Sequence, residues 1–138
     1  YLAVDEGTAK NMGADAAGIF ISQSYLTGIG SEENKTFLAA MEEKFGSELK
    51  TPNDLSVPQY EAIYLYKAAA EKAGSVEPQA IVDALPEVSF TGPRGAIQMN
   101  KQHHTPLTMY LGQVTDAGGV EVIKTFDNVD PGEQCPNL

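Results

Sequence analysis

The strongest constraint on the fold is the order in which the spacing of apolar residues changes along the chain. A short apolar run at residues 18–22 predicts one buried strand. Three helical segments follow this strand before the spacing changes to the period of two that is typical of β-strands. One early strand cannot supply the right-handed βαβ units that three helices need. We therefore expect an α/β chain whose sheets are completed by residues outside this sequence.

The first long helix is predicted at about residues 32–45. Ser31 is suited to the N-cap, and two glutamates in the first turn favour the positive end of the helix dipole. Gly46 follows the last apolar residue and is typical of a helix C-terminus. A shorter helix is predicted upstream, beginning near Asp5 and ending near Gly13.

Two more helices are predicted in the middle of the chain. The first covers about residues 58–73, with Ser56 as its N-cap. The second covers about residues 76–85, where Ser75 caps its start and Pro86 closes its end. No strand pattern separates the two helices, so they are expected to follow each other directly.

The last third of the chain is predicted to form strands. Period-two spacing indicates strands at residues 96–99, 109–114 and 120–126. Residues 116–119 contain two glycines between the last two strands and predict a hairpin loop. The tail at residues 127–138 contains two prolines and a glycine and is expected to be irregular.

Composition and charge exclude several classes of function. Nine basic residues against nineteen acidic residues give a net charge of −10. That balance argues against binding to nucleic acid or to an anionic membrane surface, since both depend on Lys and Arg. The longest apolar run is far shorter than the ~20 residues of a membrane-spanning helix. No signal peptide is visible, and the sequence opens with Tyr1 rather than Met.

The residues offer little support for catalysis or for a metal site. The sequence has no nucleophile elbow, no zinc-protease motif and no phosphate-binding loop. His103 and His104 are adjacent, so on a strand they would point to opposite faces. Cys135 is the one cysteine, either a tail thiol or half of a disulfide whose other cysteine is missing from this sequence. We therefore expect no catalytic residue, no metal ligand and no cofactor.

Two places in the sequence are candidates for binding a small solute. Ser24 and Tyr25 follow the strand at residues 18–22, and ligands of α/β proteins bind beyond the carboxyl ends of strands. The alternative is a plain loop in which Tyr25 packs beneath residues 28–30. Glu6 stands at a predicted helix start, where it either favours the helix dipole or holds a solute ammonium group.

The order of motifs resembles the type I periplasmic solute-binding proteins, the uptake receptors for branched-chain amino acids, amides and urea. The resemblance covers about residues 2–126 and is nearer to the amide and urea branch. Its two most specific parts are the end of the helix at residues 70–75 and the turn at residues 90–95. The motifs that carry it are Val4-Asp5-Glu6, Met12-Gly13, Ala17-Gly18, Ser24-Tyr25, Glu33-Asn34-Lys35, Phe37, Phe45-Gly46, Tyr60-Glu61-Ala62, Ala70-Glu71-Lys72-Ala73-Gly74-Ser75, Ala84-Leu85, Phe90-Thr91-Gly92-Pro93-Arg94-Gly95, His103-His104-Thr105 and Leu111-Gly112-Gln113-Val114.

The resemblance implies a two-lobed fold of which this chain is the C-terminal portion. In that fold each lobe has three α/β/α layers, and hinge crossings join the lobes. The resemblance assigns residues 1–52 to the distal lobe and residues 53–105 to the proximal lobe. The hairpin at residues 106–126 returns to the distal lobe, and residues 127–138 form a tail.

The resemblance also implies a function without catalysis. It indicates a periplasmic receptor that delivers a small polar solute, such as a branched-chain amino acid, an amide or urea, to an ABC permease. Its partners would be the solute, the permease subunits and the remaining N-terminal part of its own protein. The alternatives are an amide-sensing regulatory protein of the same fold and a non-catalytic part of a larger enzyme.

The family's site is carried over to four residues. Tyr25 and Ser24 would face the cleft from the distal lobe, and Tyr25 is expected at the cleft mouth. Leu55 would form an apolar wall from the other lobe. Glu6 would correspond to the acidic residue that holds the ammonium group of an amino acid.

Overall fold

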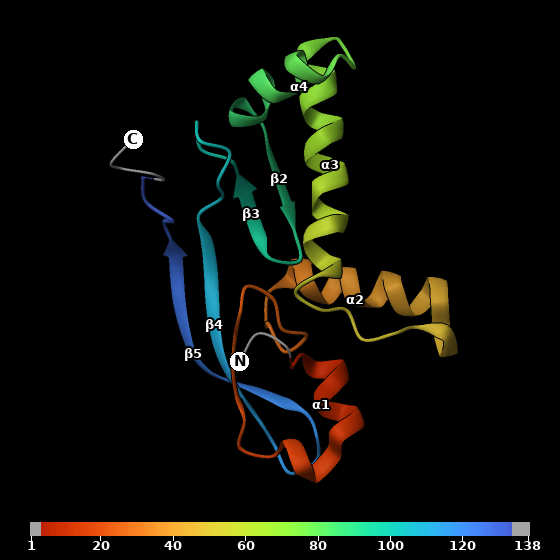
Figure 1. Ribbon diagram of the computed structural model, residues 1–138. Coiled ribbons are helices and arrows are strands. Elements are labelled where there is room, and N and C mark those ends of the chain that lie inside the picture. Colours follow the sequence, from red (N-terminus) through yellow and green to blue (C-terminus); the bar gives the residue numbers. More distant parts are fainter. Residues whose placement is uncertain (1–3, 134–138) are drawn as a thin grey trace.

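A computed structural model describes residues 4–133 of the chain (Figure 1). In chain order the elements are α1 (Glu6–Met12), β1 (Phe20–Gln23), α2 (Glu32–Phe45), α3 (Ser56–Ala73), α4 (Pro78–Ala84), β2 (Ser89–Gly92), β3 (Gly95–Gln98), β4 (Leu107–Val114) and β5 (Val120–Val129). We call α1, β1, α2, β4 and β5 the first half of the structure, and α3, α4, β2 and β3 the second half. Among the described helices, none is long and apolar enough to cross a membrane.

The larger sheet joins the two ends of the chain. It has three antiparallel strands in the order β1-β4-β5, so the early strand β1 pairs with the late strand β4. Ile21 lies opposite Gly112 in this pairing. A Cβ atom at Gly112 would come within 2.7 Å of Val120 and 3.1 Å of Leu26, so the side chains packed there require glycine. The register therefore places Ile21 over the core with no side chain opposing it.

The smaller sheet is the hairpin of β2 and β3. Its register runs from Ser89 opposite Gln98 to Gly92 opposite Gly95. The hairpin lies alongside α3, on the side of the molecule that also holds α4 (Figure 1). Strand β2 was not among the predicted strands, because the residues before Gly95 were interpreted as a turn.

Two separate groups of buried side chains hold these elements. The first core cluster contains Val4, Ala9, Ala16, Ile21, Tyr25, Leu26, Ile29, Phe37, Val57 and Val114. The second core cluster contains Ala69, Ile81 and Ala84. Helix α3 contributes Val57 near its start to the first cluster and Ala69 near its end to the second. This helix therefore connects the two clusters. The assignment of residues 1–52, 53–105 and 106–126 to lobes of a larger fold stays a prediction.

An aromatic row runs from α2 through α3 to β2. It consists of Phe37, Tyr60, Tyr64 and Phe90. The ring centroids of Phe37 and Tyr60 are 5.0 Å apart, and those of Tyr60 and Tyr64 are also 5.0 Å apart. Tyr64 and Phe90 stack at 4.6 Å with an interplanar angle of 8°. The row packs α2 against the helix and hairpin of the other half.

The predicted helix at residues 32–45 and the hairpin at residues 116–119 are confirmed. The side chain of Ser31 accepts a hydrogen bond from the Asn34 N–H, as an N-cap does, and Gly46 ends α2 with a φ of 47°. Strands β4 and β5 pair on either side of the predicted loop. Strand β5 continues to Val129, so the first residues of the predicted irregular tail are a strand.

The predicted cap of α3 is wrong. Ser56 is the first helical residue rather than the N-cap, and the side chain of Asn53 performs the capping. Asn53 Oδ1 accepts hydrogen bonds from the N–H groups of Leu55 and Ser56. An asparagine caps as well as a serine does, and it lies earlier in the connection, so the helix begins sooner than predicted.

Candidate functional site

The candidate site lies where the loop after β1 meets the connection that precedes α3. The Ser24 N–H donates to Asp54 Oδ1 at 2.9 Å, and the Ser24 hydroxyl donates to the same oxygen. These residues are 30 positions apart in the sequence. Their contact brings together the two segments that the resemblance assigned to opposite walls of a cleft.

A buried ion pair lies beside this contact. Arg94 Nε donates to Glu61 Oε2 at 2.6 Å, and the Arg94 backbone N–H donates to Glu61 Oε1 at 3.1 Å. The Glu61 side chain is fully buried, and the Arg94 side chain is 9% exposed. Hydrogen bonds to both carboxylate oxygens offset the cost of removing the two charges from water.

Gly92 makes room for this ion pair. A Cβ atom at Gly92 would lie 2.6 Å from the Phe90 ring and 3.0 Å from Glu61 Oε1. Both neighbours are held in place, Phe90 by stacking and Glu61 by Arg94. The glycine of the turn is therefore required by the carboxylate that lies against it.

Ser24 connects the ion pair to Asp54. Arg94 Nη1 donates to Ser24 Oγ at 2.8 Å. The serine hydroxyl has one proton, which it gives to Asp54, and it accepts from the guanidinium, which has only donors. The sequence predicted Ser24 as a polar contact for solute. The structure shows it 6% exposed with its hydroxyl engaged by the protein, and its contact with solute stays a prediction.

Tyr25 does not lie at a cleft mouth, where we expected it. Its side chain is fully buried in the first core cluster. Its hydroxyl donates to Asn34 Oδ1 at 2.9 Å, and Asn34 Nδ2 donates to the carbonyl oxygens of Thr27 and Ile29. The ring therefore packs beneath the loop at residues 28–30, because Asn34 folds that loop over it.

The environment of Tyr25 keeps its hydroxyl a donor. Burial raises the pKa of Tyr25, and the carboxylates of Glu6 and Glu61 raise it further. A neutral phenol donates its one proton to Asn34, and this fixes the orientation of the amide. A contact between Tyr25 and a solute stays a prediction.

Glu6 is bound by the chain itself. Its two carboxylate oxygens accept from the Thr27 N–H at 2.7 Å and from the Thr27 hydroxyl at 2.6 Å. Burial raises the pKa of Glu6, although the hydrogen bonds from Thr27 oppose that rise. The carboxylate thus fastens the start of α1 to the loop after β1. Its role as the partner of a solute ammonium group stays a prediction.

Asp5 fastens the same helix to the connection before α3. One oxygen accepts from the Thr8 N–H as the cap of α1, and the other accepts from Asn53 Nδ2 at 2.7 Å. Burial alone would raise the pKa of Asp5, but the hydrogen bonds from Thr8 and Asn53 together lower it. Asn53 therefore joins α1 to the start of α3.

Leu55 is 75% exposed and adjoins Asp54. The structure thus leaves this predicted wall residue open to solvent next to the Ser24–Asp54 contact. Its contact with a solute stays a prediction.

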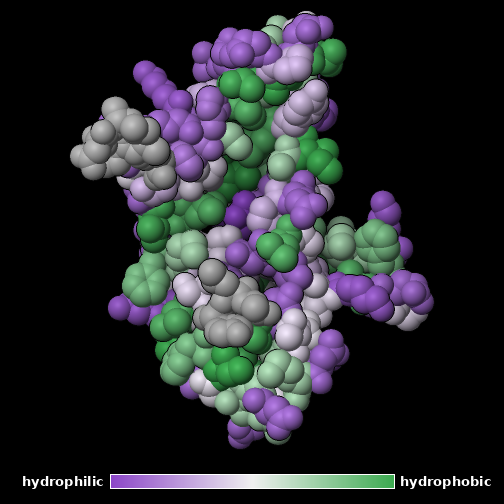
Figure 2. Space-filling model, viewed as in Figure 1, coloured by the Kyte–Doolittle hydropathy of each residue, from purple (hydrophilic) through white to green (hydrophobic). Residues whose placement is uncertain are grey.

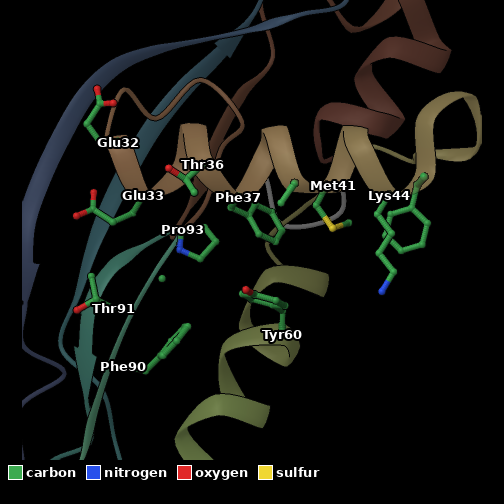
Figure 3. A pocket seen from close by; sticks show the side chains of 13 residues that line it. Glu32, Glu33, Thr36, Phe37, Met41, Lys44, Tyr60, Phe90, Thr91 and Pro93 are labelled. Carbon is green, nitrogen blue, oxygen red and sulfur yellow. The ribbon is translucent and has the colours of Figure 1, made fainter.

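An open groove of about 800 Å³ lies between α2, the start of α3 and the turn that joins β2 to β3 (Figure 3). Phe37 and Met41 of α2 face it from one side, and Tyr60 of α3 faces it from the other (Figure 3). None of the four predicted site residues lines this groove. Its full lining is Glu32, Glu33, Thr36, Phe37, Ala40, Met41, Lys44, Phe45, Tyr60, Phe90, Thr91, Gly92 and Pro93.

Sequence reasoning missed Glu61, Arg94 and Asp54. A signal for Glu61 was present, because it stands at helical spacing between the buried residues Val57 and Leu65 of α3. A carboxylate within a buried stripe needs a cationic partner.

Within residues 4–133, no group of three or more metal-ligating side chains is positioned to hold an ion.

Comparison with known proteins supports the same family. The model of the periplasmic binding protein family matches residues 1–119. A curated relative, limonene hydroxylase from Geobacillus stearothermophilus, is 22% identical over 118 residues. That alignment covers 86% of this chain and 22% of the relative.

Solved structures of similar fold are mostly solute-binding proteins. One from Rhodopseudomonas palustris BisB5, in complex with 3,4-dihydroxybenzoic acid, is 26% identical with a TM-score of 0.78. One from R. palustris in complex with 4-hydroxybenzoate is 28% identical with a TM-score of 0.76. The leucine-binding protein LivK from Thermotoga maritima is 22% identical with a TM-score of 0.73 and shows the shared fold.

The match covers most of this chain but a minority of each structure. For these three structures it covers 93%, 92% and 88% of this chain, and 36%, 36% and 34% of theirs. The chain is therefore a mixed α/β portion that matches about a third of a two-lobed type I fold. This chain belongs to the periplasmic binding protein family.

Proposed function

We propose that this chain is the C-terminal portion of the solute-binding receptor of an ABC importer. The observation that carries the proposal is the contact of Ser24 with Asp54, which joins the loop after β1 to the connection before α3. In the predicted two-lobed arrangement these segments line the cleft from opposite sides. The R. palustris and T. maritima structures support a receptor by similarity of fold.

For the solute, we propose a small molecule rich in N–H donors, such as an amide, urea or an amino acid. The guanidinium of Arg94 is already paired with Glu61, so it offers little to a solute carboxylate. Asp54 next to exposed Leu55 offers an acceptor beside an apolar surface. The benzoates bound by the R. palustris proteins are the competing solute class, because those proteins are 26% and 28% identical to this chain.

We propose binding without catalysis, in the periplasm and with an ABC permease as partner. The hydroxylase relative shares 22% of its length with this chain, and the candidate residues here are engaged in structural hydrogen bonds. An amide-sensing regulatory protein is the second candidate, since it would use the same cleft without a permease.

Calorimetry on the intact protein that contains this chain tests the proposed solute. The probes are acetamide, urea, leucine and 4-hydroxybenzoate. We expect micromolar or tighter binding of one of the first three and little binding by the 138-residue chain alone. Tight binding of 4-hydroxybenzoate alone would contradict the solute class, and binding of none of the probes would contradict the proposed function.

Uptake measurements separate a receptor from a regulator. Cells that express the intact protein together with its permease should accumulate the labelled solute, and deletion of the receptor should abolish that uptake. Unchanged uptake after deletion would favour the regulatory protein.

A further inference from the structure

A continuous network of hydrogen bonds between charged and polar side chains joins the two halves of the structure. It runs from Glu61 of α3 to Arg94 in the β2–β3 turn, then to Ser24 after β1, and ends at Asp54 before α3. Arg94 and Ser24 are 70 positions apart in the sequence. Their bond therefore connects the hairpin of one half to the larger sheet of the other.

The Glu61–Arg94 end of this network is fixed. Glu61 is fully buried. Breaking a buried ion pair leaves an uncompensated charge inside the protein, which strongly lowers the free energy of unfolding. The backbone N–H of Arg94 also holds Glu61, so the turn itself is fastened to α3. The guanidinium therefore presents Nη1 to Ser24 from a rigid position.

The other end of this hydrogen-bond network, formed by Ser24 and Asp54, contributes one residue to each predicted wall of the cleft. Ser24 precedes Tyr25, and Asp54 precedes the exposed Leu55. The Ser24 hydroxyl gives its one proton to Asp54 and accepts from Arg94, so it has no second proton for a solute. The Ser24 hydroxyl therefore links Arg94 to Asp54 and is not placed to donate a hydrogen bond to a solute.

We propose that Arg94 is a positioning residue for solute binding, which acts through Ser24 to set the distance between the two cleft walls. This proposal rests on the proposed function, because it concerns the same cleft. The Arg94 side chain is 9% exposed, and its Nε and Nη1 are bonded to Glu61 and Ser24. The bond between Arg94 and Ser24 selects the relative position of the loop after β1 and the connection before α3.

A double-mutant cycle in the intact protein tests the proposal. The variants are Ser24→Ala, Arg94→Lys and the double variant, and the probe is whichever of acetamide, urea, leucine and 4-hydroxybenzoate binds the wild type most tightly. Ser24→Ala keeps the Glu61–Arg94 pair, and Arg94→Lys keeps a cation on Glu61 but loses the forked geometry. Each single variant should weaken binding by about tenfold, the loss expected for a hydrogen bond to a charged group.

The size of the combined effect decides the outcome. If Arg94 acts through Ser24, the double variant should bind no more weakly than Ser24→Ala alone. The control is Ser22→Ala, an exposed serine of β1 two positions before Ser24, which should leave affinity unchanged. Small-angle scattering should also show that Ser24→Ala reduces the compaction caused by the probe, a change that a merely structural role would not produce.

Two results would overturn the positioning role. Additive losses in the double variant would show that Arg94 and Ser24 act independently. Arg94→Lys with a lower melting temperature and unchanged affinity would show that the pair supports only the fold. A wild type that binds none of the four probes would instead overturn the proposed function, and the positioning role with it.

Discussion

The two core clusters are built from different kinds of side chain. The first contains large residues such as Ile21, Tyr25 and Phe37. The buried side chain of Asn34 lies beside it and makes three hydrogen bonds. The second consists of Ala69, Ile81 and Ala84. The first cluster therefore encloses its residues on all sides, whereas the second brings α3 and α4 together along one small-residue seam.

The second half, in contrast, leaves several apolar side chains exposed. Ile63 and Tyr66 of α3 are 69% and 51% exposed. Hydrophobic residues form a band over the region of α3, α4 and the hairpin (Figure 2). A face of this kind needs a sheet or another surface against it. The comparison teaches that one half carries its own core, while the other half supplies one side of a core.

The largest expected effect comes from breaking the buried ion pair between α3 and the β2–β3 turn. Glu61→Ala leaves the buried Arg94 guanidinium without its counter-charge, with only the neutral Ser24 hydroxyl bonded to it, and should lower the free energy of unfolding by about 3–5 kcal/mol. Urea denaturation of the chain measures this loss. The double variant with Arg94→Met should recover part of it, since no charge then remains buried.

The exposed pair of Lys67 and Glu71 is the control for this experiment. Its atoms are 3.6 Å apart and both side chains are 68% exposed. Glu71→Ala should change the free energy of unfolding by less than about 0.5 kcal/mol. An equal loss from Glu61→Ala and Glu71→Ala would show that burial of the pair has no energetic consequence.

Matched truncations compare the two clusters directly. Ile21→Ala should cost about 4 kcal/mol, because the surrounding large side chains cannot close the cavity. Ile81→Ala should cost about 2 kcal/mol, because fewer side chains surround it. Chemical denaturation of both variants checks the order. A larger loss from Ile81→Ala would reverse our ranking of the clusters.

Removal of one hydroxyl tests the polar bond inside the first cluster. Tyr25→Phe removes the donor to Asn34 and should cost about 1–1.5 kcal/mol in the free energy of unfolding. Tyr66→Phe, at an exposed position of α3, should cost almost nothing. Equal melting temperatures for wild type and Tyr25→Phe would contradict the structural role of this hydroxyl.

The pH dependence of stability reports the burial of Glu6. The pKa of Glu6 is raised from its usual value of 4.5, so the folded chain holds this proton at a pH where the unfolded chain has lost it. Its contribution therefore favours the folded state at low pH and is lost as pH rises from 4.5 through the raised pKa. Denaturation of wild type and Glu6→Gln across this range should show a difference that changes in that direction. A constant difference would contradict the raised pKa.

The smallest effect is expected on the open face of α3. Ile63→Ser in the isolated chain should change the free energy of unfolding by less than about 0.5 kcal/mol, because the side chain contacts mainly solvent. The same substitution in the intact protein should be more destabilising, since there the face is expected to be covered. Equal small effects in both proteins would show that nothing covers Ile63.

The long elements could be predicted from the sequence because their signals are local. The caps and apolar spacing of α2 and the two glycines between β4 and β5 are enough to locate them. Strand β2 was missed because its residues resemble a turn and are held by α3, a contact between distant positions. Ser56 was misjudged because Asn53 competes for the same cap.

The candidate site was harder to predict, because its bonds join residues far apart in the chain. Ser24 and Tyr25 follow a strand as predicted, although β1 is buried on one face only. Hydrophobic spacing does not say which way the following loop folds. Asn34 decides that question, and it belongs to α2. The partner of Glu61 stands 33 positions away, beyond the reach of any local pattern.

The aromatic row also makes the chain its own optical reporter. The sequence has six tyrosines and no tryptophan, so its near-ultraviolet circular dichroism comes mainly from tyrosine. The rings of Tyr60 and Tyr64 are 5.0 Å apart and lie between Phe37 of α2 and Phe90 of β2. Any rotation of α2 against the hairpin changes the angles in this row. A rotation of this kind within the chain would therefore alter its tyrosine band without an added dye or an engineered residue.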